Sequence, residues 1–329
     1  DYRLAGTAPV VHISLEDGKD RRSDWYDLAV TVTIEGERVH FGPLFAALAA
    51  GESHLVLPSG TYLSIDRPEL VQLRELILEA RELTDKRDGE SLKVSRFQAG
   101  LWDELVALGT IEQQASSWKE SISAIRSLDE VPVPELPAGL DAELRPYQRD
   151  GYAWLSFLAD HSLGGILADD MGLGKTLQAL AMIARQVEGG SGPFLVVAPT
   201  SVVGNWAREA ARFVPGLTVA TIHGTKARRR TELADEIAGA DLVITSYALF
   251  RIENDAYREQ QWAGLLLDEA QFVKNHQGKT YQCARRLTAP FKLAITGTPL
   301  ENSLMDLWSM LSIVAPGLYP DPQRFAAGY

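Results

Sequence analysis

Cysteine is nearly absent from this chain of 329 residues, because Cys283 is its only one. A single cysteine excludes a disulfide within the chain and any zinc site built from several cysteines. No apolar run approaches the roughly 20 residues that span a bilayer, so we expect no membrane partner. The chain begins Asp1-Tyr2-Arg3, without an initiator methionine or a signal-peptide pattern. We therefore expect a fragment of a longer protein that works in an intracellular, reducing location.

Positive charge is also in short supply. The chain has 32 lysine and arginine residues against 44 aspartate and glutamate residues, a net charge of −12. Residues 1–139 hold 14 basic and 24 acidic residues, whereas residues 140–329 hold 18 and 20. An acidic balance argues against nucleic acid as a partner, but a nearly neutral domain can still carry a local basic face. The charge therefore lowers the expectation of DNA binding without excluding it.

A proline-rich stretch divides the chain into two regions. Three prolines occur in DEVPVPELPAG, residues 129–139. Proline disfavours helix in the residue before it, so this stretch is typical of an extended linker. We expect an accessory domain over 1–128 and a larger domain over 140–329.

The front region combines strands with helices, which predicts a small α+β domain. In residues 25–42 the side chains of Leu28, Val30, Val32 and Ile34 fall on one face, as in a half-buried strand. No set of catalytic residues occurs in this region, so a role in protein interaction or autoregulation is expected. The expected elements are strand pairs over 25–42 and 54–65, then helices over 68–83, 95–109 and 116–128.

The back region has short, continuous apolar runs separated by helical patterns. Continuous rather than alternating runs are typical of parallel strands that are buried on both faces. This pattern predicts a doubly wound α/β fold with a mostly parallel sheet. The expected strands are 164–168, 194–199, 218–224, 240–246, 264–269 and 291–296, and the expected helices include 176–187 and 205–214.

The stretch ADDMGLGKT, residues 168–176, lies between an expected strand and an expected helix. Backbone N–H groups in such a glycine-rich loop form an anion-binding concavity at the helix N-terminus. Lys175 would reach the β- and γ-phosphates of a nucleotide, and the Thr176 hydroxyl would hold Mg²⁺. The general pattern has glycine six positions before the lysine, where this chain has Asp169. A plain strand–helix turn with a solvated lysine is the alternative.

Two acidic residues supply a second half to this site. Asp268 and Glu269 follow the apolar run Leu265–Leu267, so both would project from the carboxyl end of a buried strand. Ligands bind at that edge in open α/β sheets. Asp268 suits Mg²⁺, and Glu269 suits polarising an attacking water. Together the two halves predict a nucleoside-triphosphatase.

The order of several motifs resembles the first lobe of Swi/Snf-type ATPases, and most of all their bacterial HepA-like branch. These ATPases belong to the helicase superfamily whose lobes have a RecA-like fold. The resemblance covers residues 140–329. The motifs are LRPYQRDG (144–151), DDMGLGKT (169–176), PTSVVGNW (199–206), ITSY (244–247), DEAQ (268–271), KN (274–275) and ITGTPLEN (295–302).

The resemblance implies roles for individual residues. Gln148 would recognise adenine, and Gln271 stands where many relatives have histidine, so the coupling there can differ in detail. Glu269, Lys175 and Asp268 are the implied catalytic residues, and Thr176 and Asp268 the implied Mg²⁺ ligands. The implied nucleotide-binding residues are Arg145, Gln148, Met171, Gly172, Leu173, Gly174, Lys175, Thr176 and Leu177. Residues Gln271, Thr296, Gly297 and Thr298 would couple the nucleotide to DNA, and the implied DNA contacts are Thr200, Ser201, Thr245, Ser246, Lys274 and Asn275.

These roles together imply an ATP-dependent translocase or remodelling ATPase that acts on double-stranded DNA, with ATP and Mg²⁺ as cofactors. Its expected partners are duplex DNA, a protein or nucleoprotein complex that it remodels, and a second lobe of the same polypeptide. The expected location is the bacterial cytoplasm, at the nucleoid. The second lobe would supply the arginines that stabilise the transferring phosphate. The chain alone is therefore expected to bind ATP and to hydrolyse little of it.

Other interpretations stay open. One is a strand-separating or RNA-activated helicase of the same superfamily, and another is a nucleotide-gated binding module without turnover. The presence of Glu269 argues against the binding module, which has no need of a water-activating carboxylate. We expect Trp206 to pack in the core. The cluster of Lys226, Arg228, Arg229 and Arg230 is either an edge that contacts phosphates or a solvated helix face.

Overall fold

The computed structural model of the chain has two compact units, Asp1–Ile122 and Ser123–Tyr329. The structure describes residues 131–298, 304–319 and 322–328 of the second unit. In the first unit it describes residues 3–4, 9–17, 25–34, 37–40, 52–56, 61–82, 92–95 and 110–114, and the single positions 44, 47, 98, 105 and 107. The helix expected over 116–128, and most of the one expected over 95–109, lie outside the described residues.

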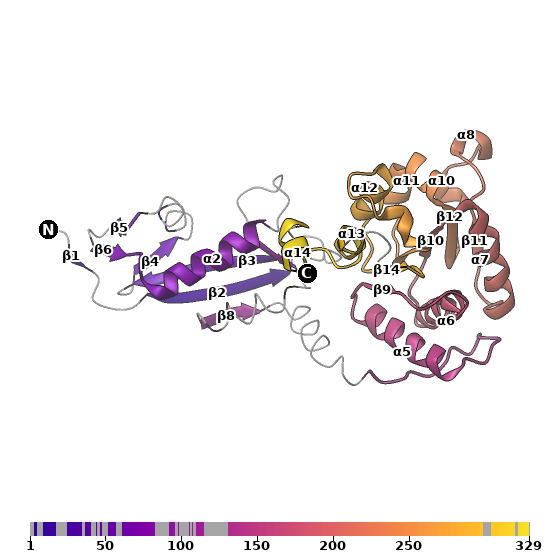
Figure 1. Cartoon of the computed structure of the whole chain (residues 1–329), viewed down its shortest axis with the longest axis horizontal. Helices are drawn as coiled ribbons and strands as arrows, with labels where there is room; N and C mark the ends of the chain where they lie inside the picture. The colour runs from indigo at the N-terminus through magenta and orange to yellow at the C-terminus, as the bar shows by residue number, and fades with distance from the viewer. Residues whose placement is uncertain are drawn as a thin grey trace. The chain divides into compact units, whose positions relative to one another are not determined.

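The first unit is an α+β domain, as predicted (Figure 1). Its main sheet pairs β3 (Trp25–Ile34) antiparallel with β2 (Val10–Asp17), β4 (Glu37–His40) and β7 (Leu92–Ser95), and β2 pairs parallel with β8 (Thr110–Gln114). A smaller sheet contains β1 (Arg3–Leu4), β6 (Thr61–Ser64) and β5 (His54–Val56).

The sequence pattern accounts for the core of this unit. Ile34 pairs with Glu37, which confirms the expected reversal between β3 and β4. Leu28, Val30 and Val32 are buried on one face of β3, as their alternation predicts. The helix α2 (Pro68–Glu82) begins at a proline, whose fixed φ suits the first helical position.

The linker region lies along the surface of the second unit. Residues 131–140 form neither helix nor strand. The Tyr152 hydroxyl donates a hydrogen bond to the Glu135 carbonyl at 2.7 Å, and the Glu188 carboxylate accepts from the Gly139 N–H at 3.0 Å. The Asp141 N–H donates to the Phe213 carbonyl at 2.7 Å. Polar contacts with three separate helices therefore hold this end of the linker.

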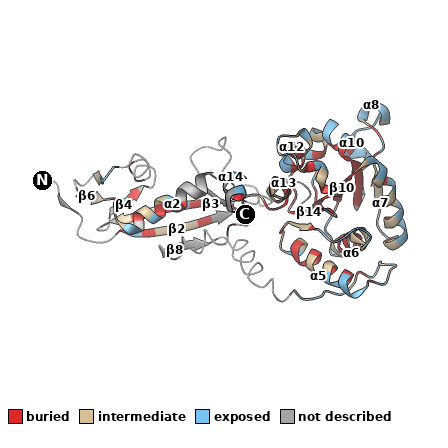
Figure 2. Cartoon of the chain, in the orientation of Figure 1, coloured by how far each residue is buried: buried red, intermediate tan, exposed pale blue. Residues whose placement is uncertain are grey.

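The second unit is built on one sheet of six parallel strands, in the order β11-β12-β10-β13-β14-β9. Each strand lies within an apolar run that the sequence predicts. Every residue of β10, β12, β13 and β14 is buried, so these strands pack on both faces (Figure 2). The strands are β9 (Gly165–Leu167), β10 (Phe194–Ala198), β11 (Val219–Thr221), β12 (Leu242–Ser246), β13 (Gly264–Leu267) and β14 (Phe291–Ile295).

Helices form two layers around this sheet, which makes the unit a RecA-like doubly wound fold (Figure 1). One layer contains α5 (Pro146–Asp160), α6 (Lys175–Glu188) and α7 (Thr200–Phe213). The other contains α10 (Tyr247–Ile252), α12 (Lys279–Arg286) and α13 (Leu304–Val314). Shorter helices are α8 (Lys226–Arg229), α9 (Leu233–Glu236), α11 (Asn254–Arg258), η2 (Ala270–Val273) and α14 (Pro322–Gly328).

Helix α7 begins at Thr200, five residues before the expected start at 205. Four of the five intervening residues, 200–204, are β-branched or glycine, which have low helix propensity. Val203 is nevertheless buried beneath this first part of the helix. Packing against the sheet therefore outweighs local preference, and it places Thr200 and Ser201 in the first turn of a helix rather than in a loop.

Gly164, just before β9, allows a close approach of backbone segments. A Cβ atom at this position would lie 1.7 Å from the carbonyl oxygen of Val314 and 2.9 Å from that of Lys292. Both obstacles are backbone atoms, one at the end of α13 and one in β14. Only glycine therefore fits where α13 and β14 meet the start of β9.

We expect Gly164→Ala to lower the free energy of unfolding of the second unit by about 1–3 kcal/mol, because the added methyl group must displace packed backbone. Urea denaturation followed by circular dichroism measures the change. Gly216→Ala is the matched control, since a Cβ there meets no atom within 4 Å. Equal stabilities for the two variants would contradict the close approach.

Candidate functional site

Three neighbouring strands carry the predicted motifs. In the sheet, β14 lies between β13 and β9, with Leu267 paired to Ala294 and Ile295 paired to Leu167. The chain therefore leaves all three strands at the same edge. Asp268 and Glu269 follow β13, Thr296 follows β14, and the glycine-rich loop follows β9. Motifs about a hundred residues apart in the sequence thus meet at one edge of the sheet.

The glycine-rich loop has the backbone geometry of an anion site. Gly172 and Gly174 have φ values of 83° and 77°, in the left-handed region that favours glycine. Gly174 is the N-cap of α6, and no side chain caps this end of the helix or places an acid in its first turn. The N–H groups of that first turn are therefore available to an anion.

Lys175 lies against this loop. Its ammonium donates to the Asp169 carbonyl at 2.6 Å and to the Asp170 carbonyl at 3.0 Å. Asp169 stands where the general phosphate-loop pattern has glycine. Its carboxylate accepts a hydrogen bond from the Gln178 side chain of α6 at 3.3 Å. An acidic side chain in this position is therefore tied to the helix behind the loop.

The carboxylate of Asp268 is held on both oxygens. Oδ2 accepts from the Trp206 indole Nε1 at 2.7 Å, and Oδ1 accepts from the backbone N–H of Glu269 at 2.9 Å. Burial raises the pKa of Asp268, while the Trp206 bond and the charge of Lys175 oppose that shift. Each oxygen keeps a lone pair, so this carboxylate fits a hard cation such as Mg²⁺.

A chain of hydrogen bonds joins Glu269 to the residues after β14. Gln271 Nε2 donates to Glu269 Oε2 at 2.8 Å, and Thr296 Oγ1 donates to Gln271 Oε1 at 3.4 Å. The Thr298 N–H in turn donates to Thr296 Oγ1 at 3.1 Å. The Gln271 amide therefore links the two segments: it donates to the Glu269 carboxylate and accepts from the Thr296 hydroxyl.

The glycine-rich loop also approaches the segment after β14. A Cβ atom on Gly297 would lie 3.0 Å from the side chain of Met171, which is otherwise 81% exposed. Met171 of the loop and the Thr296–Thr298 segment are therefore neighbours at the carboxyl edge of the sheet.

Gln148 bridges α5 to the glycine-rich loop. Its Oε1 accepts from the Arg145 N–H at 2.9 Å, at the start of α5, and its Nε2 donates to the Leu173 carbonyl at 3.2 Å. The side chain is buried, and a Cβ on Gly174 would lie 2.5 Å from its nitrogen. Gln148, which the sequence led us to expect at the adenine, therefore supports the glycine-rich loop.

The six expected DNA contacts divide into two groups. Thr200, Ser201 and Asn275 are exposed, and Lys274 is partly exposed, 3.9 Å from Asp306. The other two expectations need correction, because the structure directs Thr245 and Ser246 away from the surface.

Thr245 is fully buried, and its hydroxyl accepts from the Tyr257 hydroxyl at 2.7 Å. Ser246 is 5% exposed, and its hydroxyl accepts from the Leu249 N–H as the N-cap of α10. Both side chains therefore serve the interior of the fold, and we no longer count them among the DNA contacts.

The four basic residues at α8 differ in their exposure. The Arg229 side chain, 7% exposed, forms an ion pair at 2.8 Å with the Glu253 side chain, which is 10% exposed. Lys226, Arg228 and Arg230 are exposed. Arg229 therefore anchors the segment to the loop after α10, and three rather than four cationic groups of the cluster reach the surface.

Two aromatic residues, each at the end of a quoted motif, take part in the site through contacts that the sequence did not predict. Trp206 is fully buried, which confirms its place in the core, but its bond to Asp268 was not expected. The Tyr247 hydroxyl donates to the Asp268 carbonyl at 2.8 Å, and its ring stacks on Phe272 with centroids 5.1 Å apart. These contacts join residues 62 and 21 positions apart, which no local pattern indicates.

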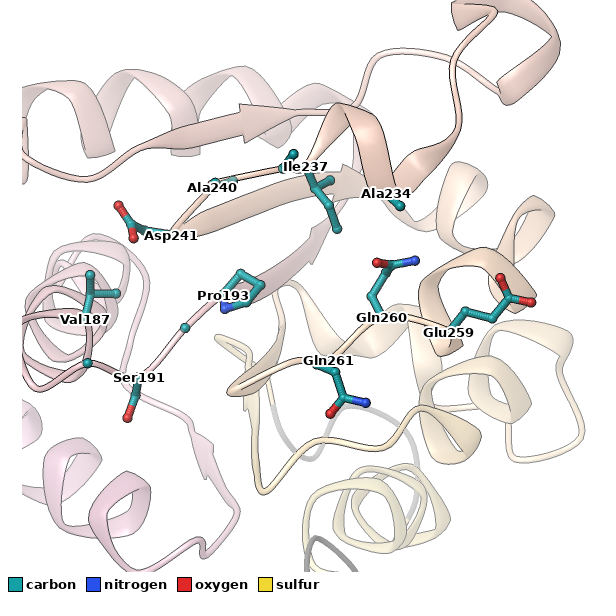
Figure 3. Close-up of a pocket in the computed structure, with 14 residues that line it drawn as sticks. Val187, Ser191, Pro193, Ala234, Ile237, Ala240, Asp241, Glu259, Gln260 and Gln261 are labelled. Carbon is teal, nitrogen blue, oxygen red and sulfur yellow. The ribbon is translucent and has the colours of Figure 1, made fainter.

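A hollow of about 580 Å³ lies at the opposite edge of the sheet (Figure 3). Val187, Pro193, Ile237 and Asp241 line it, near the starts of β10 and β12. It is therefore separate from the site at the carboxyl edge. In the described part of the chain no group of three or more His, Cys, Asp or Glu residues forms a metal cluster, and no helix there has the length and apolarity to cross a membrane.

Burial of Tyr257 predicts how stability responds to alkali. Burial raises its pKa from 10.0 to about 12. The unfolded chain therefore loses this proton first, and stability falls as pH rises from 10 to 12, by about 2–3 kcal/mol. We expect Tyr257→Phe to flatten this fall, as measured by urea denaturation at pH 8–12. An unchanged pH dependence would contradict the assignment.

Comparison with known proteins adds a family to this geometry. Residues 147–329 match the model of the SNF2-related domain. The chain is 33% identical over 287 residues, 83% of its length, to YwqA of Bacillus subtilis (strain 168), whose name describes a candidate ATP-dependent helicase/translocase. It is 39% identical over 195 residues, 58% of its length, to the ISWI chromatin-remodeling complex ATPase ISW1 of Saccharomyces cerevisiae. These alignments cover 31% of YwqA and 17% of ISW1, so the chain spans about a third or less of these relatives.

A solved structure supports the same family. The Sulfolobus solfataricus SWI2/SNF2 ATPase core in complex with dsDNA matches 60% of this chain and 41% of its own, at 36% identity and a TM-score of 0.54. The sequence motifs, the six-stranded parallel sheet and these matches agree with one another. The chain belongs to the SNF2-related family.

Proposed function

We propose that this chain is part of an ATP-driven translocase that acts on double-stranded DNA and remodels protein complexes bound to it. The observation that carries the proposal is the convergence of three motifs at the carboxyl ends of β9, β14 and β13. Family membership supports ATP hydrolysis, and a related core that has been solved with dsDNA supports the choice of partner.

In this proposal the loop and α6 bind the nucleotide. The N–H groups around Gly174 and the ammonium of Lys175 hold the β- and γ-phosphates, replacing the lysine's present bonds to loop carbonyls. Thr176 and Asp268 hold Mg²⁺, which neutralises charge on the phosphates when it is bound. Met171, Gly172, Leu173 and Leu177 line the loop, and Gln148 with Arg145 contacts the base.

Glu269 polarises the attacking water in this proposal. Its backbone has a φ of 47°, and its carboxylate is held by the Gln271 amide at 2.8 Å. A held carboxylate loses little freedom when it aligns a water, which favours catalysis. Because Gln271 also bonds to Thr296, a shift after β14 would reach the water-directing group.

DNA would approach the same edge of the sheet. Thr200, Ser201, Lys274 and Asn275 remain the candidate contacts, together with the Thr296–Thr298 segment as the coupling element. Short hydroxyl and amide groups bond phosphate oxygens without distinguishing bases. We therefore propose backbone contacts that follow one strand of the duplex, independent of sequence.

We expect ATP hydrolysis by the parent protein to be stimulated more by duplex DNA than by single-stranded DNA. The measurement is the steady-state rate with no DNA, with each DNA form and with RNA. Glu269→Gln should lower each rate by about 10²–10⁴ while retaining ATP binding, because it removes only the general base. A rate that is indifferent to DNA would overturn duplex as the activator and favour RNA or a protein.

We also expect the 329-residue chain alone to bind ATP with little turnover. In this proposal a second lobe of the parent supplies arginines to the transferring phosphate, and such an arginine contributes about 10³–10⁵ in rate in other phosphoryl-transfer enzymes. Multiple-turnover rates of the chain and the parent, measured side by side, test this. Comparable rates would show that these residues suffice for hydrolysis.

A further inference from the structure

Trp206 connects α7 to the carboxylate proposed for Mg²⁺. Its side chain is fully buried, and Nε1 lies 2.7 Å from Asp268 Oδ2. The other carboxylate oxygen accepts from the Glu269 N–H at 2.9 Å. Two donors, one on each oxygen, therefore set the rotation of this carboxyl group.

A buried indole N–H needs a hydrogen-bond acceptor, and a backbone carbonyl is sufficient for this purpose. Trp262 donates to the backbone carbonyl of Tyr257 at 2.7 Å, and Trp308 donates to that of Tyr319 at 2.8 Å. Trp206 instead donates to a largely buried carboxylate at the open edge of the sheet. The hydrogen bond of Trp206 thus involves a carboxylate of the proposed site, whereas those of Trp262 and Trp308 involve only backbone carbonyls.

We propose that Trp206 is a positioning residue, whose indole N–H orients the Asp268 carboxylate so that its remaining lone pairs are presented to Mg²⁺. The inference rests on the proposed function of this site as an ATP and Mg²⁺ site. Groups that hydrogen-bond a metal's ligands orient those ligands, and their loss typically lowers metal affinity or activity 10–100-fold.

The position of Trp206 on α7 gives this bond a second consequence. Trp206 lies six residues after Thr200, about 9 Å along the helix from its exposed first turn. The bond therefore joins the Asp268 carboxylate to the helix that carries two candidate DNA contacts, Thr200 and Ser201.

Trp206→Phe in the 329-residue chain tests the proposal, because it removes the N–H and keeps an aromatic ring. The readout is equilibrium binding of a ribose-labelled fluorescent ATP analogue, measured by anisotropy across a Mg²⁺ titration and again in EDTA. We expect the Mg²⁺ concentration at half-saturation to rise about 10-fold or more, with binding in EDTA unchanged.

Trp262→Phe is the matched control. Trp262 is 3% exposed and loses a hydrogen bond of the same length, but to a backbone carbonyl outside the site. It should leave the Mg²⁺ titration unchanged at a comparable cost in thermal stability. An equal rise in both variants, or none in Trp206→Phe, would overturn the positioning role.

A further variant guards against loss of folding. If Trp206→Phe does not fold, benzothienylalanine at position 206 keeps the shape of the indole and replaces its N–H by sulfur, and the same rise is expected. A wild-type chain that binds the analogue without responding to Mg²⁺, or that does not bind it, would overturn the proposed site and this inference together. A wild-type response with unchanged variants would overturn the inference alone.

Discussion

The parallel ladder that joins β13, β14 and β9 is the constraint on which the site depends. Parallel pairing makes the three strands end at one edge, and the registers of Leu267 with Ala294 and of Ile295 with Leu167 place those ends in line. All residues of β13 and β14 are buried, so burial on both faces stabilises this part of the ladder. Acids, hydroxyls and the glycine-rich loop meet only because their strands pair in this order.

Polar groups at this edge are held by partners that belong to the fold. The Asp268 carboxylate accepts hydrogen bonds from the Trp206 indole and the Glu269 N–H. The Asp268 backbone carbonyl accepts a hydrogen bond from the Tyr247 hydroxyl. A buried polar group without partners is costly, whereas a satisfied network is rigid. The same bonds that offset the burial of Asp268 therefore fix its geometry, which is what a metal-binding carboxylate requires.

Two residues depart from the motif pattern, and each forms hydrogen bonds with neighbouring polar groups. Asp169 replaces a glycine, and its carboxylate is taken up by Gln178 of the following helix. Gln271 stands where the resemblance leads us to expect histidine, and its amide has one donor for Glu269 and one acceptor for Thr296. A neutral amide can make both bonds at once without titrating near neutral pH, so the link it makes does not depend on the protonation of its own side chain.

The sequence by itself determined the six parallel strands, the glycine-rich loop, the acids after β13 and the family, because apolar runs and glycine spacing are local signals. Only the tertiary structure decided that α7 begins at Thr200, that Thr245 is buried, that Arg229 pairs with Glu253, and that Trp206 bonds to Asp268. Each of these depends on partners distant in the chain. Local patterns record which residues prefer burial, whereas the packing of strands and helices decides which polar atoms meet there.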